Sequence, residues 1–203
     1  MLFNNSRKFD FLPQLEFSNG LPLDVVKEFK LLGVIVTSNL NWQSQVNNMC
    51  AKAYRRMWII RRLKKFGVCF DNLLLVYSTQ IRCIVEFAVA AWNPNLTKAQ
   101  ITQMERIQKY ALAIILAEDY VSYNNALAVT GLCTLESRRK SLCLEFANKA
   151  FKHPKFSHWF ELKPTQPYNT RSKPTILKPV LCRTNRYERS PIAYLTKLLN
   201  ENK

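Results

Sequence analysis

Basic side chains crowd into one short stretch of the chain, and aromatic residues are interleaved with them. The aromatic residues are Tyr54, Trp58, Phe66 and, further along, Tyr77. Cations neutralise phosphates and release counterions, while aromatic rings can stack on bases or sugars. The pattern therefore indicates a surface that binds the nucleic acid backbone without sequence preference. The basic residues, with no acid among them, are Lys52, Arg55, Arg56, Arg61, Arg62, Lys64 and Lys65.

Two plainer interpretations of this stretch remain open. A run of charges is often only the solvated face of a helix. Tyr54, Trp58 and Tyr77 could equally be core or half-core residues of that helix and the next, and this alternative is stronger for Tyr77 than for Trp58.

The charge of the whole chain points to the same kind of partner. Its 203 residues include 30 basic and 14 acidic ones, a net charge of +16. Such a surplus attracts polyanions such as nucleic acid or an anionic membrane. The residues before Trp42 are balanced, with four basic and four acidic side chains, whereas residues 152–203 hold eleven basic and three acidic ones. We predict a nucleic acid partner, an RNA–DNA hybrid or another duplex, with no membrane and no small-molecule substrate.

Catalytic constellations are hard to find in the sequence. His153 and His158, with Cys143 upstream, could be imagined as zinc ligands, but their spacing fits no strong ligand pattern. No serine or cysteine lies in a nucleophile-elbow pattern, and four scattered glycines cannot form a phosphate-binding loop. The separated acids near the N-terminus are predicted to be surface charges rather than a two-metal site. These acids are Asp10, Glu16, Asp24 and Glu28. We therefore predict no cofactor, no metal and no enzymatic activity for the chain as it stands.

Cysteine usage and hydropathy suggest an intracellular protein. None of the six cysteines forms a C-x-x-C pair, and five of them, in apolar or helical-looking stretches, are expected to be reduced core thiols. The N-terminus does not resemble a signal peptide, and no apolar run is expected to reach the ~20 residues of a membrane span. The five are Cys50, Cys69, Cys83, Cys133 and Cys143.

Periodicity predicts a mainly α fold with a small antiparallel β element in residues 1–42. The strand signals are Met1–Phe3, Gln14–Phe17 and the β-branched run Leu31–Thr37, with a turn at Asn19-Gly20.

A helical domain is expected over residues 43–152, because apolar residues recur there every three or four positions. Predicted boundary residues are Gly67, Asp71 as an N-cap, a Thr97–Gln100 capping box, Gly131, Thr134 as an N-cap, and Pro154. The expected helices run from Gln43 to Gly67, from Leu73 to Trp92, from Thr97 through Ile115, from Asn124 to Val129 and from Leu135 to Lys152.

Residues 153–203 hold six of the nine prolines and the second basic surplus. This composition predicts an extended, loosely ordered basic tail that closes with a short amphipathic helix, Ile192–Leu199.

Several short strings resemble the C-terminal part of reverse transcriptases from LINE-type, non-LTR retrotransposons, in particular the jockey-like elements. The first string, Lys30-Leu31-Leu32-Gly33-Val34 followed by Leu40-Asn41-Trp42, is similar to the K-Y-L-G-V…L-x-W segment at the end of the palm, where the family grips the primer terminus. The second, Tyr77-x-x-x-Ile81-Arg82-x-x-Val85-Glu86-Phe87 with Trp92-Asn93-Pro94, resembles a thumb helix of the family. Cys83 replaces the usual proline there, which predicts a straighter helix.

Further strings follow in the order that the family has them, up to Asn200. They are Met104-Glu105-Arg106-Ile107-Gln108-Lys109, then Tyr123, Leu127, Gly131-Leu132 and Leu135-Glu136-Ser137-Arg138-Arg139, and finally Arg183-Thr184-Asn185-Arg186-Tyr187, Ser190-Pro191-Ile192 and Leu198-Leu199-Asn200.

The resemblance implies the thumb end of an RNA-directed DNA polymerase that lacks the paired metal-binding aspartates of the palm. The whole polymerase would use Mg²⁺, and Met1 would correspond to an internal methionine of a longer frame. A remnant without function, or a helical interaction module that binds nothing specific, is the alternative. The residues expected to form a primer grip are Lys30, Leu32, Gly33 and Val34, and those expected to bind nucleic acid are Lys52, Arg55, Arg56, Trp58, Arg62 and Lys65.

Overall fold

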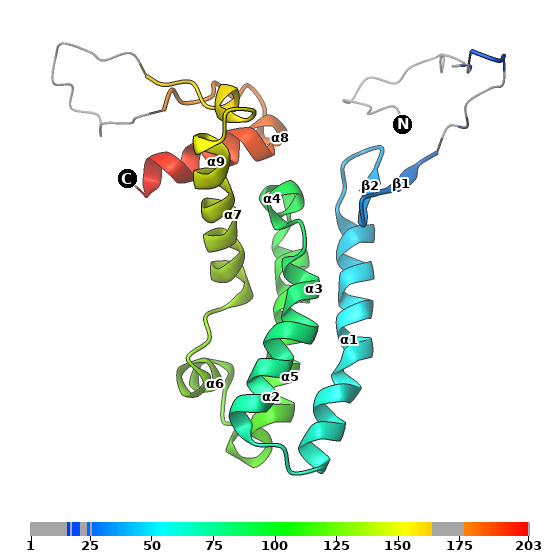
Figure 1. Ribbon diagram of the computed structural model, residues 1–203, viewed down its shortest axis with the longest axis vertical. Helices are drawn as coiled ribbons and strands as arrows, with labels where there is room; N and C mark the ends of the chain where they lie inside the picture. Colours follow the sequence, from blue (N-terminus) through cyan, green and yellow to red (C-terminus); the bar gives the residue numbers. More distant parts are fainter. Residues whose placement is uncertain (1–15, 17, 21–23, 25, 164–176, 203) are drawn as a thin grey trace, which may run out of the picture. The chain divides into compact units, whose positions relative to one another are not determined.

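The computed structural model describes Glu16, residues 18–20, Asp24, and the ranges 26–163 and 177–202. The chain divides into two compact units, Met1–Met49 and Cys50–Lys203. Its described part is mainly helical and contains a small antiparallel sheet near the N-terminus (Figure 1), which confirms the predicted fold class.

The first unit contains a tight β-hairpin. Strand β1 (Glu28–Leu31) pairs antiparallel with β2 (Val34–Thr37), and Leu31 lies opposite Val34. The two turn residues, Leu32 and Gly33, have φ values of 47° and 89°, the left-handed conformations that close a two-residue hairpin. The run Leu31–Thr37, which carries the strand signal, therefore holds the end of β1, the turn and the whole of β2.

The other β predictions fall mostly on residues that the structure does not describe. Met1–Phe3 lies outside the described residues, as does Gln14–Phe17 except for Glu16, which takes part in an isolated bridge. Asn19 lies in a turn and Gly20 has a φ of 76°, as an Asn-Gly turn predicts.

Helix α1 (Gln43–Lys65) begins directly after the hairpin, and its first turn holds the hairpin in place. The Ile35 backbone N–H donates to Gln45 Oε1 at 2.9 Å, and Val34, Trp42 and Val46 are buried. A two-stranded hairpin is marginal by itself in water. Packing on the helix start supplies what the short ladder lacks.

The long helices of the second unit bury one side each. The stripe of α1 continues through Ala53, Met57 and Ile60, all at most 1% exposed, and the basic residues lie away from it. The helix ends two residues before Gly67, whose φ of 76° suits glycine, as predicted.

The segment after α1 is not the single regular helix that was predicted from Leu73 to Trp92. It consists of α2 (Phe70–Val76), a π-helical segment η1 (Tyr77–Arg82), α3 (Cys83–Glu86) and α4 (Val89–Trp92). Cys69, not Asp71, occupies the N-cap. The straighter helix inferred at Cys83 is wrong as well, because the π segment ends there and the chain turns at Ala88.

This segment also corrects the expectation that no apolar run approaches a membrane span. Phe70–Asn95 is long and apolar enough to cross a membrane by length and composition alone. Its buried stripe packs as a core element: α2 contacts α5 and α4 contacts α7. It also carries Arg82 and Glu86, whose side chains lie 3.1 Å apart. The buried stripe comprises Leu73, Tyr77, Ile81, Val85, Val89 and Trp92.

The break before α4 gives a first prediction. Ala88 has a φ of 52° and is exposed. A left-handed backbone costs an L-residue roughly 1–2 kcal/mol, which glycine avoids at a smaller cost in chain entropy. We expect Ala88→Gly to raise the free energy of unfolding by about 0.5–1 kcal/mol, measured by denaturant titration. Ala91→Gly, in the regular backbone of α4, should lower it; destabilisation by both would contradict the strain.

The remaining helices of the bundle agree with the sequence. They are α5 (Lys98–Leu116), with the Thr97–Gln100 capping box formed in both directions, α6 (Tyr123–Thr130), ended by Gly131, and α7 (Leu135–Lys152), capped by Thr134. Short 3-10 turns connect the elements: η2 (Asn93–Asn95), η3 (Ala117–Asp119) and η4 (Ser157–Trp159).

The C-terminal end is more ordered than an extended tail. After α8 (Asn185–Glu188), helix α9 (Pro191–Glu201) packs against α7 and buries Leu195, Leu198 and Leu199 (Figure 1). The terminal amphipathic helix is confirmed, whereas residues 177–202 belong to the folded unit instead of extending from it. The three prolines between residues 164 and 176 lie outside the described part.

Candidate nucleic-acid interface

Helix α1 presents its predicted cations and Trp58 to solvent. With 3.6 residues per turn, Arg55, Trp58, Arg62 and Lys65 fall on one side of the helix. All four are exposed, and Trp58 is 60% exposed, so it is not a core residue. We call the exposed set the α1 basic face. It comprises Lys52, Arg55, Arg56, Trp58, Arg61, Arg62 and Lys65.

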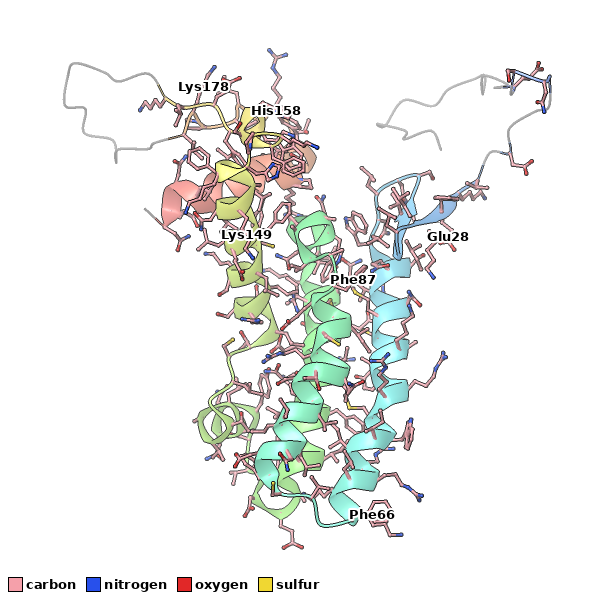
Figure 2. The ribbon with its side chains drawn as sticks, viewed as in Figure 1. Glu28, Phe66, Phe87, Lys149, His158 and Lys178 are labelled. Carbon is pink, nitrogen blue, oxygen red and sulfur yellow. The ribbon has the colours of Figure 1, made fainter. Side chains whose placement is uncertain are left out.

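Much of the charge on this face is not neutralised inside the protein. Within the described ranges, no ion pair involves Lys52, Arg55, Arg62 or Lys65. The guanidinium of Arg62 lies 5.7 Å from the ring centroid of Phe66, which is 74% exposed and projects from the end of α1 (Figure 2). These groups remain available for phosphates and bases.

Other cations of α1 have structural partners. Arg56 donates to the carbonyl oxygen of Gln80 at 2.9 Å, and this bond ties α1 to the π segment. Lys64 donates to the carbonyl oxygens of Ile114 and Ile115 at 2.8 and 2.6 Å, at the C-terminal end of α5. A cation there satisfies the last carbonyls and complements the helix dipole. Lys64 is therefore half-buried and outside the α1 basic face.

Helix α5 extends the α1 basic face with residues that the sequence analysis missed. The rings of Tyr54 and Tyr110 meet edge to face at 6.0 Å, and Arg61 both lies over the Tyr110 ring at 5.3 Å and donates to its hydroxyl. Partial burial raises the pKa of Tyr54, and Cys50 adds a smaller rise. The positive charge of Arg106 opposes both effects. Only the packing of two helices brings these groups together, so no local spacing could reveal them.

Tyr77 does not belong to the interface. It is fully buried, and its hydroxyl donates to Gln108 Oε1 at 2.7 Å. Gln108 Nε2 in turn donates to the Tyr123 hydroxyl at 3.2 Å and to the Cys133 carbonyl at 2.8 Å, and Tyr123 donates to Glu105. The core interpretation of Tyr77 is confirmed, and its ring cannot stack on a base.

A buried guanidinium continues this polar interior. Arg139 is 0% exposed, and its Nε donates to Asn93 Oδ1 at 3.0 Å. Among the described residues, its two terminal nitrogens and Glu105 Oε2 are buried without a hydrogen-bond partner. Burial lowers the pKa of Arg139, and the carboxylates of Glu105 and Glu136 oppose this shift. Glu105 thus supplies part of the compensating charge for Arg139.

The residues expected to form a primer grip occupy the hairpin. Leu32, at the turn, is 89% exposed, whereas Val34 is buried against the start of α1. Lys30 is exposed in β1, and Gly33 completes the turn. Every residue of β1 is exposed, so one side of the hairpin is open to a further partner.

The residues weighed as zinc ligands are Cys143, His153 and His158. Within the described part, no group of three or more histidine, cysteine, aspartate or glutamate side chains could hold a metal ion. Cys143 is buried in the bundle, and burial raises its pKa to about 11. His153 Nδ1 accepts a hydrogen bond from the Lys155 backbone instead, at 3.2 Å.

All six cysteines are free, but only two of the five expected core thiols are buried. Cys50 and Cys143 are buried, whereas Cys69, Cys83 and Cys133 are exposed. Cys69 is the N-cap before α2, Cys133 lies in the loop between α6 and α7, and Cys83 lies on α3 off its buried residue. Periodicity predicts the helices but not which residues fall at their ends and loops.

The comparisons with known proteins found no matching family model, no matching curated protein and no matching solved structure. The resemblance to LINE-type reverse transcriptases therefore rests on the sequence strings, and it stays a prediction.

Proposed function

We propose that this chain holds double-stranded nucleic acid by its phosphate backbone, as the thumb end of a non-LTR reverse transcriptase does. The observation that carries the proposal is the α1 basic face, with exposed cations and no acid in its stretch. In the described part, no ion pair inside the protein satisfies Lys52, Arg55, Arg62 or Lys65. The phosphates of a bound nucleic acid would pair with these cations.

The aromatic groups on the same side support a nucleic acid over another polyanion. Trp58 and Phe66 are 60% and 74% exposed. Exposing apolar rings to water costs free energy, and contact with a sugar or base would offset that cost. On single strands, rings between cations stack on bases without reading the sequence, and on a duplex such rings would contact sugars. Arg106 and Tyr110 of α5 widen the surface beyond a single helix.

The chain carries no polymerase activity in this proposal. The aspartates that bind Mg²⁺ in the family lie upstream of the segment that Lys30–Val34 resembles, so the chemistry would belong to another part of a longer polymerase. An intracellular location follows from the proposed partner.

Salt dependence tests the proposal directly. The chain should bind an RNA–DNA hybrid with an affinity that falls as salt rises, by roughly 0.9 log units per log unit of salt for each phosphate contact. Replacing Arg55, Arg62 and Lys65 by alanine should reduce the slope by roughly 2.7, three contacts' worth. Arg56 is left in place because it also binds the Gln80 carbonyl.

A charge-matched control separates the face from the overall charge. Lys140, Lys149 and Lys197 are exposed and pair with acids elsewhere in the same unit. Alanine at these three positions removes the same formal charge and should leave the slope nearly unchanged. Equal effects of both triple variants would reject the α1 basic face as the contact surface. A folded chain without salt-sensitive binding would favour the non-binding interaction module.

A further inference from the structure

A hollow of about 850 Å³ opens at the C-terminal end of the second unit. Its walls come from α4, α7, η4, residues 178–181 and the α8–α9 pair. No residue of the α1 basic face lines it. Pockets for compact organic molecules measure about 300–1,000 Å³ and occur where several elements meet. We call this feature the C-terminal hollow.

Aromatic rings from three different elements line the C-terminal hollow. Phe146 belongs to α7, Trp159 to η4 and Tyr187 to α8. Phe146 and Tyr187 are 41% and 52% exposed, so part of each ring has no protein neighbour. Aromatic rings prefer offset or edge contacts with other rings, each contributing about 0.5–1.5 kcal/mol beyond area burial. The wall therefore suits a planar aromatic ligand.

A few polar groups face the same space. In the described part of the chain, no hydrogen bond engages the ring nitrogens of His158, the Tyr187 hydroxyl or the Ser190 hydroxyl. Lys178 Nζ lies 2.9 Å from Glu161 Oε2, and both side chains belong to the lining. Glu161 neutralises much of the Lys178 charge, so the preference for a negative charge on the ligand comes from these hydrogen-bond donors together with the long-range field of a chain charge of +16.

Hydrogen bonds within the chain fix the frame of the C-terminal hollow. Leu177 is 2% exposed and exchanges two hydrogen bonds with the Asn200 side chain, at 3.0 and 3.1 Å. The next residue, Lys178, donates its backbone N–H to the Glu161 carbonyl at 2.8 Å. Buried Leu195 lies in the lining from α9. A wall fixed in this way loses little entropy on binding, which favours affinity.

We propose that the C-terminal hollow binds a small planar aromatic molecule that carries one anionic group. The ring lies among Phe146, Trp159 and Tyr187, and the anion lies near Lys178 and His158. This site is separate from the proposed nucleic-acid surface, and neither depends on the other.

Two fluorescent probes with the same ring system test the proposal. Anilinonaphthalene sulfonate is anionic, and N-phenylnaphthylamine is its neutral counterpart. We expect saturable, one-site binding of the sulfonate, roughly tenfold tighter than the neutral probe, because the sulfonate accepts hydrogen bonds that the neutral probe cannot accept. Equal affinities for both probes would refute the anionic part of the proposal.

Variants separate the hollow from apolar patches elsewhere on the surface. Ala91 is exposed and lines the hollow, so Ala91→Leu fills the space while adding apolar surface. The proposal requires at least a roughly tenfold loss of sulfonate affinity, whereas patch binding would be unchanged or stronger. Unchanged binding in this variant would overturn the proposal.

The charge at the hollow has its own matched pair of variants. Lys178→Ala removes the cation and leaves Glu161 facing the ligand, so the preference for the sulfonate should disappear. Lys149→Ala breaks a comparable exposed pair with Glu145, 2.7 Å long and outside the lining, and should change the affinity less than about twofold. Equal losses in both variants would show a general charge effect and refute a local anion site. Displacement of the probe by a single-stranded oligonucleotide but by no small aromatic anion would also overturn the proposal.

Discussion

Replacing Arg139 by alanine is expected to lower the free energy of unfolding by about 2–5 kcal/mol, the range for a large-to-small change in a core, which is much of the stability of an ordinary domain. The side chain is fully buried between α7 and the segment that holds Asn93. Its removal leaves a cavity, leaves Asn93 Oδ1 without its donor, and leaves Glu105 without its compensating positive charge. Chemical denaturation followed by circular dichroism measures the loss.

Two further variants identify the cause of that loss. Arg139→Met keeps most of the side-chain volume and removes the charge. The free energy of unfolding that this variant still loses therefore measures the cost of leaving Glu105 and Asn93 without their partner. Arg138→Ala removes the neighbouring cation, which is 39% exposed and lies 3.3 Å from Glu86. Such a half-exposed pair contributes about 1 kcal/mol or less. If Arg139→Ala were no worse than Arg138→Ala, the buried guanidinium would not stabilise the bundle.

The helices were predictable because their signals are local. The Thr97–Gln100 capping box, the Thr134 cap and the glycine at position 131 each satisfy backbone groups at a helix end, whatever packs around them. The interruption at Ala88 had no such signal, since alanine favours a helix and rarely adopts a positive φ. The apolar residues on either side of the break pack against α5 and α7. This packing outweighs the preference of alanine for a regular helix.

The strings that carry the family resemblance hold many residues of the interior. Tyr77, Trp92, Gln108 and Arg139 are buried, and Glu105 accepts a hydrogen bond from Tyr123 while its charge acts on Arg139. The resemblance is thus mainly a likeness in the residues that build a fold. The exposed cations of α1, which carry the proposed function, lie between the matched strings and were inferred from charge alone.

The extension of the α1 basic face onto α5 needed the three-dimensional structure. Tyr54 and Tyr110 are 56 positions apart in the printed sequence, and only the packing of their helices brings the two rings within 6.0 Å. The same holds for the C-terminal hollow, whose aromatic residues come from α7, η4 and α8. Sequence periodicity predicts which face of an element is buried, but not which exposed faces of separate elements meet.

Alkaline pH is expected to unfold the second unit, with Tyr77 as one of its triggers. Burial raises the pKa of Tyr77 far above its ordinary value of 10.0, and burial with the Glu105 hydrogen bond raises that of Tyr123. The unfolded chain releases these protons above about pH 10, whereas the folded chain retains them. The stability that these two tyrosines contribute is therefore complete below pH 10 and is lost as pH rises, by about 1.4 kcal/mol per pH unit for Tyr77 alone. Burial raises the pKa of Cys50 and Cys143 to about 11, which adds a loss in the same direction from about pH 9.

Tyr77→Phe isolates the contribution of that hydroxyl. At neutral pH the variant should be less stable by about 1 kcal/mol, because Gln108 Oε1 loses its donor. Above pH 10 its stability should fall less steeply, by about 1.4 kcal/mol per pH unit, because one retained proton is gone. The two stability curves are thus expected to cross near about pH 11. Tyr187→Phe, which removes an exposed hydroxyl, provides the control, and parallel curves for Tyr77→Phe and the unmodified chain would mean that Tyr77 does not keep its proton in the folded state.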